Sequence, residues 1–393
     1  MNAKNCLITV LFILFGFAMF VPVVYSQMSE EVTQSSFFKG EITRILSREE
    51  DEKYDIKELK QVVEVELSKS KEKIIITYIV QPISKISDYY LKEGDKVIVS
   101  KDFFSGSPEY HVYDRYRLGS IFVIFLIFVL GVVIFSGWKG LSSLLGLFIS
   151  ILIIYFFIVP RIIRGENPII IGLMGTFAIA VLSIYTSHGF NKRTSVALLS
   201  TLITLSAGII LSILFVDYAW LFGLGQEEAL LLQVNSSISF DLKGLLLCGI
   251  IIGTLGVLDD ITTAQVSTVD EIRKANTKLS RKELYKRGLS VGREHISSLV
   301  NTLVMAYVGA SLPLFLLFYV GSGPSFWVTL NSEFIAEEVI RTLVGSMALV
   351  LAVPISTLLA SYILPRSNDS QKKHGRCDCH ELHLDCNVLK SKG

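Results

Sequence analysis

Residues able to do chemistry gather at the end of an apolar run near residue 258. Asp259 and Asp260 follow that run directly, and hydroxyl side chains continue after them at helical spacing. On a helix, Asp260, Thr263 and Ser267 share one face. Carboxylate and hydroxyl oxygens are the ligands that hard cations prefer. A carboxylate at membrane depth is costly, so it tends to face a cavity or a partner.

Two interpretations of this polar stretch stay open. In the first, Asp259, Asp260, Thr263 and Ser267 line a transport path or coordinate a cation, and Asn301 of a later apolar run joins them in the interior. In the second, the acids lie at the membrane interface, where they neutralise nearby basic residues or cap the next helix.

Small residues precede the acid pair at helical spacing. Gly249, Gly253 and Gly256 lie about one turn apart in the same apolar run. Glycines on one face of a membrane helix let a neighbouring helix approach closely. The sequence therefore predicts a helix-packing contact at these three positions.

A second group of potential ligands lies in the last seventeen residues. It packs five soft or borderline ligands into ten positions: Cys377, Cys379, His380, His383 and Cys386. Thiolate and imidazole suit zinc or cuprous copper. The spacing matches no usual zinc motif, and the preceding residues have a disordered composition, so an unstructured tail without metal is the alternative.

Several classes of function lack their sequence signatures. There is no Walker-type phosphate loop, no His-Glu-x-x-His and no Gly-x-Ser-x-Gly. The net charge of +1 gives no electrostatic case for nucleic acid. We therefore predict that the protein is not an enzyme and does not bind nucleic acid.

The acid pair and its glycines must be positioned by membrane helices. Hydrophobic residues make up 51% of the 393-residue chain and charged residues 19%, below the roughly 25% of soluble domains. The apolar runs are about long enough to cross a bilayer. We predict seven spans, at 118–136, 141–159, 168–187, 195–216, 242–258, 296–320 and 338–364.

The distribution of Lys and Arg predicts an orientation. The connection 259–295 holds eight basic residues and the tail 365–393 holds six, whereas the opposite connections hold few. Because basic residues concentrate on the cytoplasmic side, both segments are expected inside and residues 27–117 outside. Residues 1–26 contain an apolar run, which predicts either a signal peptide or an uncleaved membrane anchor.

The exported segment 27–117 has the pattern of short strands. Near-alternating polar and apolar residues in 62–67, a β-branched run in 74–80 and a Gly-Asp turn before residue 96 predict about five strands. Five short strands in so few residues are typical of a small barrel or sandwich. A cap or partner-docking module is the expected role.

The stretch Gly-Thr-Leu-Gly-Val-Leu-Asp-Asp-Ile-Thr-Thr-Ala-Gln, residues 253–265, resembles the YibE/F-like family of bacterial multipass membrane proteins. So do Val-Asp-Glu-Ile-Arg-Lys-Ala-Asn at 269–276 and the Tyr-Asp-Arg-Tyr-Arg entry at 113–117. The resemblance covers roughly residues 38–365. It implies a bacterial plasma membrane location but little chemistry.

Together these patterns predict a membrane all-α helical bundle with a small N-terminal exported β-rich domain of barrel or sandwich type. The leading hypothesis for function is a permease or transport-related protein in the lipid bilayer. The alternative is a non-transporting scaffold whose exported domain recruits an envelope or secretion partner. Self-association is also compatible with the sequence.

Overall fold

The computed structural model describes residues 36–53, 56–80, 89–104, 107–225, 229, 231–233, 240–313, 316 and 325–364. The predicted signal peptide or anchor, residues 1–26, lies outside the described residues. So does the tail 365–393 with its cysteines and histidines. The chain divides into two compact units, one within Val23–Phe135 and the other containing Ser136–Gly393.

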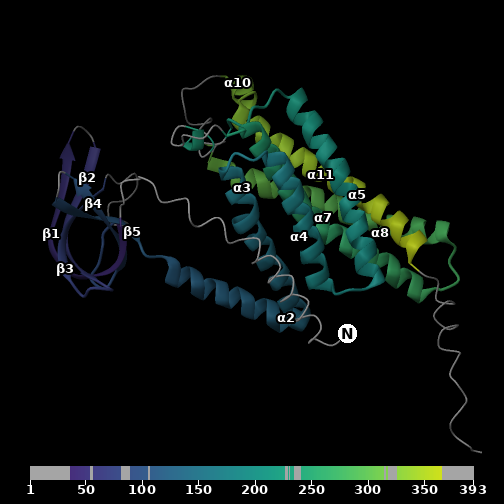
Figure 1. The fold of residues 1–393 in the computed structure, drawn as a ribbon, viewed down its shortest axis with the longest axis horizontal. Helices are drawn as coiled ribbons and strands as arrows, with labels where there is room; N and C mark the ends of the chain where they lie inside the picture. Colours follow the sequence, from purple (N-terminus) through teal and green to yellow (C-terminus); the bar gives the residue numbers. More distant parts are fainter. Residues whose placement is uncertain are drawn as a thin grey trace, which may run out of the picture. The chain divides into compact units, whose positions relative to one another are not determined.

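The first unit contains a five-stranded antiparallel sheet. Its strands are β1 (Ser36–Lys53), β2 (Ile56–Leu67), β3 (Lys73–Val80), β4 (Lys96–Phe104) and β5 (Ser107–Arg115). They are ordered β3-β2-β1-β4-β5. The two edge strands, β3 and β5, also contact each other, so the sheet curls toward a barrel (Figure 1). The predicted β-rich, barrel-like domain is confirmed.

Alternation along the strands builds the core of this sheet. On β2 the inward positions include Leu59, Gln61, Val63 and Val65, all fully buried. The one polar member is satisfied, because Gln61 Nε2 donates to the Leu91 carbonyl at 3.3 Å and Gln61 Oε1 accepts from the Leu91 amide at 2.9 Å. These paired bonds fasten the segment before β4 to the core.

The chain leaves the sheet at a charged turn. Arg117 Nη1 donates to Asp114 Oδ2 at 2.5 Å. That bond, together with the backbone N–H of Arg115, holds the pKa of Asp114 below its usual range. Helix α2 begins at the next residue, Leu118, so this ion pair marks the entry into the apolar helices.

Helix α2 (Leu118–Ile153) runs on through a π-turn (Ile154–Ile158) into α3 (Val159–Ile163), a stretch of 46 residues. At 1.5 Å per residue such a stretch measures about 70 Å, roughly twice the hydrocarbon thickness. Gly137 interrupts it with φ 57° and ψ −142°, a conformation that strongly favours glycine. The predicted spans 118–136 and 141–159 therefore lie in one continuous stretch, on the two sides of Gly137.

The second unit also holds α4 (Pro168–His188), α5 (Lys192–Tyr218), α7 (Leu242–Ala275), α8 (Arg281–Ala310), α10 (Phe326–Leu330) and α11 (Glu333–Ile363). Among the described residues, five helical stretches are long and apolar enough to cross a membrane: Leu118–Ile163, α4, α5, α7 and α11. The predicted span 296–320 falls on the second half of α8 and on residues partly outside the described ranges. Helix α8, with 30 residues, is long enough for a membrane span, but its described residues are not apolar enough to be counted among these stretches.

The prediction that residues 259–295 form a basic loop between two spans is wrong. Residues 259–275 continue helix α7, and residues 281–295 are the first half of α8. Ser280 caps the start of α8, where its Oγ accepts from the Glu283 amide at 3.2 Å. Only five residues, 276–280, connect the two helices, so the polar stretch after Leu258 is part of a packed helix.

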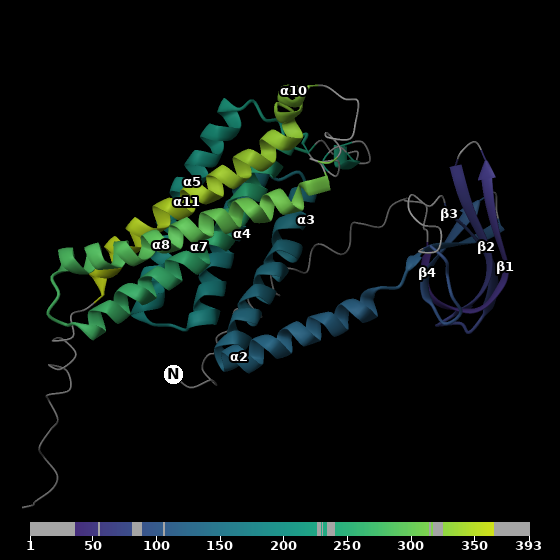
Figure 2. The ribbon, with the colours of Figure 1, turned by 180° about the vertical axis from the view of Figure 1, so that it is seen from behind.

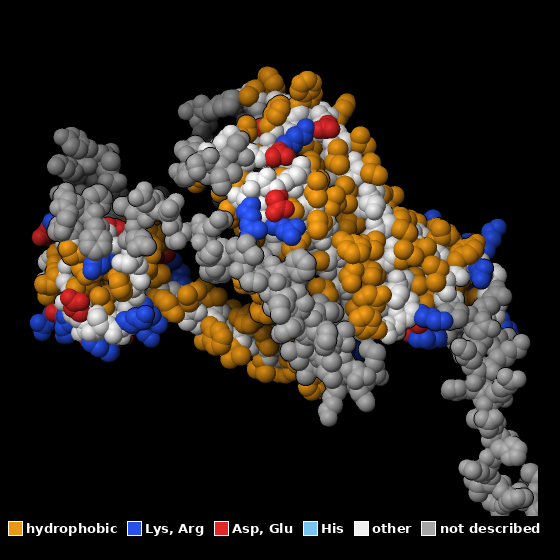
Figure 3. Space-filling model, in the orientation of Figure 1, with side chains coloured by type: hydrophobic (Ala, Val, Ile, Leu, Met, Phe, Trp, Pro, Cys, Tyr) orange, Lys and Arg blue, Asp and Glu red, His pale blue; other side chains and the backbone are white. Residues whose placement is uncertain are grey.

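Helices α5, α7 and α11 pack against one another in all three pairs, while α4 and α8 each contact α7 (Figures 1 and 2). In the space-filling view hydrophobic side chains cover the flank of this unit, and Lys, Arg, Asp and Glu side chains gather toward its ends (Figure 3). An apolar flank with charged ends is the surface expected of a bundle that spans a bilayer.

Replacement of Gly40 by Ala tests the packing of the sheet. A Cβ at this position would lie 2.5 Å from Val65 Cγ1, so the core must shift. Overpacking of this kind costs about 1–3 kcal/mol. We expect Gly40→Ala to lower the thermal unfolding midpoint of the purified protein. Gly131→Ala is the control, since a Cβ there meets nothing within 4 Å. Equal midpoints for the two variants would contradict the packing argument.

Candidate functional site

Asp259 faces a neighbouring helix from within α7. Its Oδ2 accepts a hydrogen bond from Ser183 Oγ of α4 at 3.3 Å. Its Oδ1 is buried and has no hydrogen-bond partner among the described residues, and the same holds for Thr263 Oγ1 one turn later. An unpaired polar atom in an apolar bundle costs free energy, which is accepted mainly where it serves a function.

The two adjacent acids diverge. Asp260 is exposed, whereas Asp259 is partly buried against α4. One residue on a helix corresponds to a rotation of about 100°, so the two side chains leave the helix in different directions. The pair therefore consists of one inward acid and one acid at the surface of the helical unit.

Asn301 does not join this group. It is exposed on α8, and the prediction that it faces the interior with Asp259 and Asp260 is wrong. Helix α8 turns another face inward, the one that carries the buried Gly288 and Gly292 and the partly buried Ile296. Asn301 lies off that face, so a single polar residue was a poor guide to the buried side.

The packing role predicted for the α7 glycines is also wrong within this chain. A Cβ at Gly249 or Gly256 would meet nothing within 4 Å among the described residues, and one at Gly253 would meet only Tyr307 Oη at 3.7 Å. The close approaches to α7 use glycines of its partners instead. A Cβ at Gly172 of α4 would lie 2.6 Å from Cys248 Sγ, and one at Gly288 would lie 2.8 Å from Val269 Cγ2.

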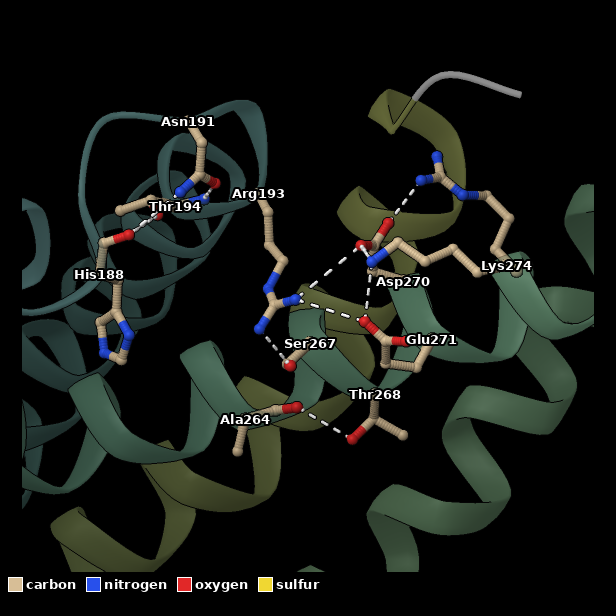
Figure 4. A network of polar contacts seen from close by, with 11 residues as sticks. His188, Asn191, Arg193, Thr194, Ala264, Ser267, Thr268, Asp270, Glu271 and Lys274 are labelled. Atoms are coloured by element: carbon tan, nitrogen blue, oxygen red, sulfur yellow. Dashed lines mark hydrogen bonds and ion pairs between the residues drawn. The ribbon is translucent and has the colours of Figure 1, made fainter. Parts of the chain in front are cut away.

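A charged bridge joins α5 to α7 about two helical turns after Asp259 and Asp260 (Figure 4). Arg193 Nη2 donates to Ser267 Oγ at 2.5 Å, and its Nη1 lies 3.9 Å from Asp270 Oδ2 and 3.6 Å from Glu271 Oε1. Asp270 is only 8% exposed and also pairs with Lys274 at 2.9 Å and with Arg273. The predicted site residue Ser267 thus serves as an anchor for an arginine.

The turn that carries Arg193 is itself held together by hydrogen bonds. Asn191 Oδ1 accepts from the Thr194 amide at 2.9 Å and caps α5, while Asn191 Nδ2 donates to the His188 carbonyl at 3.1 Å. Figure 4 shows these residues at the junction of α4 and α5. Because the two helices are tied at this turn, Arg193 fastens their common end to α7.

The sequence did not single out Gln265 as a site residue, although it is fully buried. Its Nε2 donates to the Gly288 carbonyl of α8 at 2.8 Å and to Thr357 Oγ1 of α11 at 2.7 Å. Gln265 therefore joins three helices. The available signal was its position four residues before Val269 and three after Thr262, on the face of α7 that the structure buries.

Most of the remaining buried hydroxyls form hydrogen bonds within their own helices. Thr201, Thr254 and Thr357 each donate to a backbone carbonyl four residues earlier in their own helix. Thr201 and Thr262 also meet across α5 and α7 at 2.6 Å. The α5–α7–α11 core is thus a packed interior, and a hollow of about 220 Å³ lies elsewhere, between α8 and α11 beside Tyr307 and Glu338.

Residues 124–366 match the family model for YibE/F-like protein. The chain belongs to the YibE/F-like family. The match begins inside α2 and spans the helical unit with the acid pair, which agrees with the resemblance seen in residues 253–276. No curated protein and no solved structure matches the chain. Family membership and the apolar helices together make this YibE/F-like chain a membrane protein that contacts the lipid bilayer.

The described residues contain no group of three or more His, Cys, Asp or Glu side chains placed to hold a metal ion. The acid pair therefore offers one inward carboxylate with the hydroxyls of Ser183 and Thr263 nearby. The cysteine and histidine tail, with its predicted zinc or copper site, lies outside the described residues and stays a prediction.

Replacement of Gly292 by Ala tests the three-helix junction around Gln265. A Cβ there would lie 2.9 Å from Gln265 Nε2 and closer still to Val353 Cγ1. We expect a loss of about 1–3 kcal/mol in unfolding free energy, because the packed junction must shift. The control is Gly309→Ala on the same helix, where a Cβ meets nothing within 4 Å. A loss no larger than that of the control would show that the junction is loosely packed.

Proposed function

We propose that this YibE/F-like protein is a permease-type transport protein of the bacterial plasma membrane. The observation that carries the proposal is Asp259, whose carboxylate lies inside a membrane-length helix with one oxygen unpaired and the other on Ser183. Ionisable residues in such helices are rare, and those that occur commonly mark substrate or ion paths. Asp259 would bind the permeating or coupling cation.

The route that fits these contacts runs along the seam between α7 and the α4–α5 pair. Asp260 is exposed near the mouth of this seam, Thr263 presents a hydroxyl beside Asp259, and Ser267 lies a turn further on, on Arg193. Asn301 has no part in this route. The oxygens are too few for a dedicated calcium cage, which needs six to eight, so binding would be weak and reversible.

The membrane topology belongs to the same proposal. We propose seven spans, in which Gly137 separates the first two and the second half of α8 supplies the sixth. Residues 27–117 then lie outside the cytoplasm, while the α7–α8 turn and the C-terminus lie inside, as the Lys and Arg distribution favours. The length of Leu118–Ile163, about twice a hydrocarbon core, supports two crossings in that stretch.

The alternative function is a non-transporting scaffold whose exported domain recruits an envelope partner. One observation favours it: the outer face of β3 exposes Ile75 and Ile79, at 66% and 54%. Exposed apolar side chains on a soluble domain are a common feature of protein docking surfaces. On this alternative, Ile75→Lys with Ile79→Lys would abolish recruitment of the envelope partner. Neither the parent protein nor this variant would carry flux above the background of empty vesicles.

Flux into proteoliposomes, screened over cations and small solutes, tests the transport proposal. We expect Asp259→Asn to reduce the flux at least tenfold, because the variant keeps the shape of the side chain but loses its charge. Asp217→Asn is the matched control, since Asp217 pairs with Lys243 at 2.5 Å near the opposite end of the helices.

Flux of the parent protein that is unaffected by Asp259→Asn would remove the acid from the mechanism. The scaffold would be favoured instead if the parent protein carried no flux and the Ile75→Lys, Ile79→Lys variant failed to recruit the envelope partner.

We also propose that the tail binds zinc or cuprous copper through Cys377, Cys379, His380, His383 and Cys386. Thiolate and imidazole ligands support this assignment, since both metals prefer them. The expected result is about one metal ion retained per chain after gel filtration, and none in a Cys377→Ser, Cys379→Ser, Cys386→Ser variant. Elemental analysis measures this, and the same content in both proteins would end the idea.

A further inference from the structure

Arg193 holds the α4–α5 pair against α7 at one level, and Ser183 holds it at another. Between these levels the buried Thr201 and Thr262 hydroxyls meet at 2.6 Å, and each also lies within hydrogen-bond distance of a carbonyl of its own helix. The Ser183–Asp259 bond lies deep in the seam, and the Arg193 contacts with Ser267 and Glu271 lie two to three helical turns further along α7. Eight residues of helix correspond to about 12 Å, so a short seam separates the two levels. Any path from this end of the bundle to Asp259 along the seam passes Arg193.

The arrangement of charges allows Arg193 to leave. Asp270 is nearly buried, and loss of its only cation would be costly. It has three cations, however, and both Arg273 and Lys274 belong to its own helix. If the α4–α5 pair moves away from α7, Asp270 keeps these two partners. Separation at this level therefore leaves Asp270 paired.

The ion pairs that Arg193 makes are weak. Its side chain is 40% exposed, and its nearest carboxylate oxygens lie at 3.6 Å and 3.9 Å. Ion pairs with that exposure and spacing contribute little. The 2.5 Å bond to the Ser267 hydroxyl is the main attachment. A bridge with one strong bond can open on the microsecond to millisecond timescale of helix motions.

The α4–α5 turn is able to transmit such a movement. The hydrogen bonds of Asn191 make the α4–α5 turn a rigid corner, so a displacement at Arg193 is carried into α4 and α5 together. Helix α4 carries Ser183, so the same displacement stretches the Ser183–Asp259 bond, already long at 3.3 Å. The free Oδ1 of Asp259 and the Thr263 hydroxyl would then be reached from this end of the helix.

We infer that the Arg193 bridge to Ser267, Asp270 and Glu271 is the gate of the Asp259 site, closed in this structure and opened by separation of the α4–α5 pair from α7. The inference rests on the proposed transport function, because a gate needs a site behind it. It adds the element that controls access to that site, and it identifies Arg193 as a positioning residue that acts through α4.

Thiol labelling tests the gate without any need for a known substrate. Thr263→Cys is introduced into a full-length chain whose five native cysteines are changed to Ser, and the protein is placed in lipid nanodiscs, which leave both membrane faces accessible. The measurement is the rate at which a charged, polar maleimide reacts with that thiol. We expect slow reaction with Arg193 present and a rate about tenfold higher in Arg193→Ala, because a charge-assisted hydrogen bond that holds the seam closed is lost.

Three further variants separate gating from general damage. Lys192→Ala changes the neighbouring cation, which has no ion pair among the described residues, and should leave the rate unchanged. Ser267→Ala removes only the hydroxyl partner and should raise the rate by less than Arg193→Ala does. Arg193→Lys should restore part of the protection, and this result would not be expected if the arginine were needed only for folding.

The outcomes distinguish the gate from the transport proposal. Equal rates in the parent, Lys192→Ala and Arg193→Ala proteins overturn the gate, even if Asp259→Asn abolishes flux. Rapid labelling already in the parent protein also overturns it, because the seam would be open. Faster labelling in Arg193→Ala supports the opening of the seam. If flux is then unchanged by Asp259→Asn, the gate as a control of transport is overturned. If Arg193→Ala fails to fold, the comparison of Ser267→Ala with Lys192→Ala decides, and equal rates in those two overturn the gate.

Discussion

The need to pair polar groups inside an apolar bundle controls how the helices around α7 pack. Gln265 is fully buried, and its Nε2 donates to the Gly288 carbonyl of α8 and to the Thr357 hydroxyl of α11, while its Oε1 has no partner among the described residues. These bonds require close approach, which the glycines of α8 allow. Helices α7, α8 and α11 are thus joined by a single side chain.

The side of α7 that faces α4 and α5 is held by three polar contacts. The long hydroxyl bond at Asp259, the buried Thr201–Thr262 contact at 2.6 Å and the charged bridge at Arg193 follow one another along the helix. The packed three-helix junction resists separation, because several buried groups would lose their partners at once. On the α4–α5 side Asp270 keeps two cations of its own helix when Arg193 leaves, and Thr201 and Thr262 each keep a backbone carbonyl of their own helix within hydrogen-bond distance. The polar contacts on that side can therefore open without leaving these groups unpaired.

The five-stranded sheet is built on a separate principle. Its core depends on alternation along each strand and on the paired bonds between Gln61 and Leu91. The sheet lies in a compact unit of its own. A separate unit suits a domain that docks a partner and equally one that serves as a cap.

The sequence by itself determined the membrane class, the strand-rich N-terminal segment, the family and the position of the polar stretch. These features depend on local composition and periodicity, which a chain displays before it folds. Only the tertiary structure decided which way each polar residue points. Asp259 and Asp260 are adjacent in sequence but diverge by about 100°, Asn301 lies off the packed face of α8, and the α7 glycines are not the ones that make close contacts. Residues 259–295 resemble a basic loop because their charges are dense. In the structure 259–275 belong to α7, which packs against α5 and α11, and 281–295 belong to α8, which packs against α11. Charge and spacing report what a segment contains, whereas the side that is buried depends on neighbours far away in the chain.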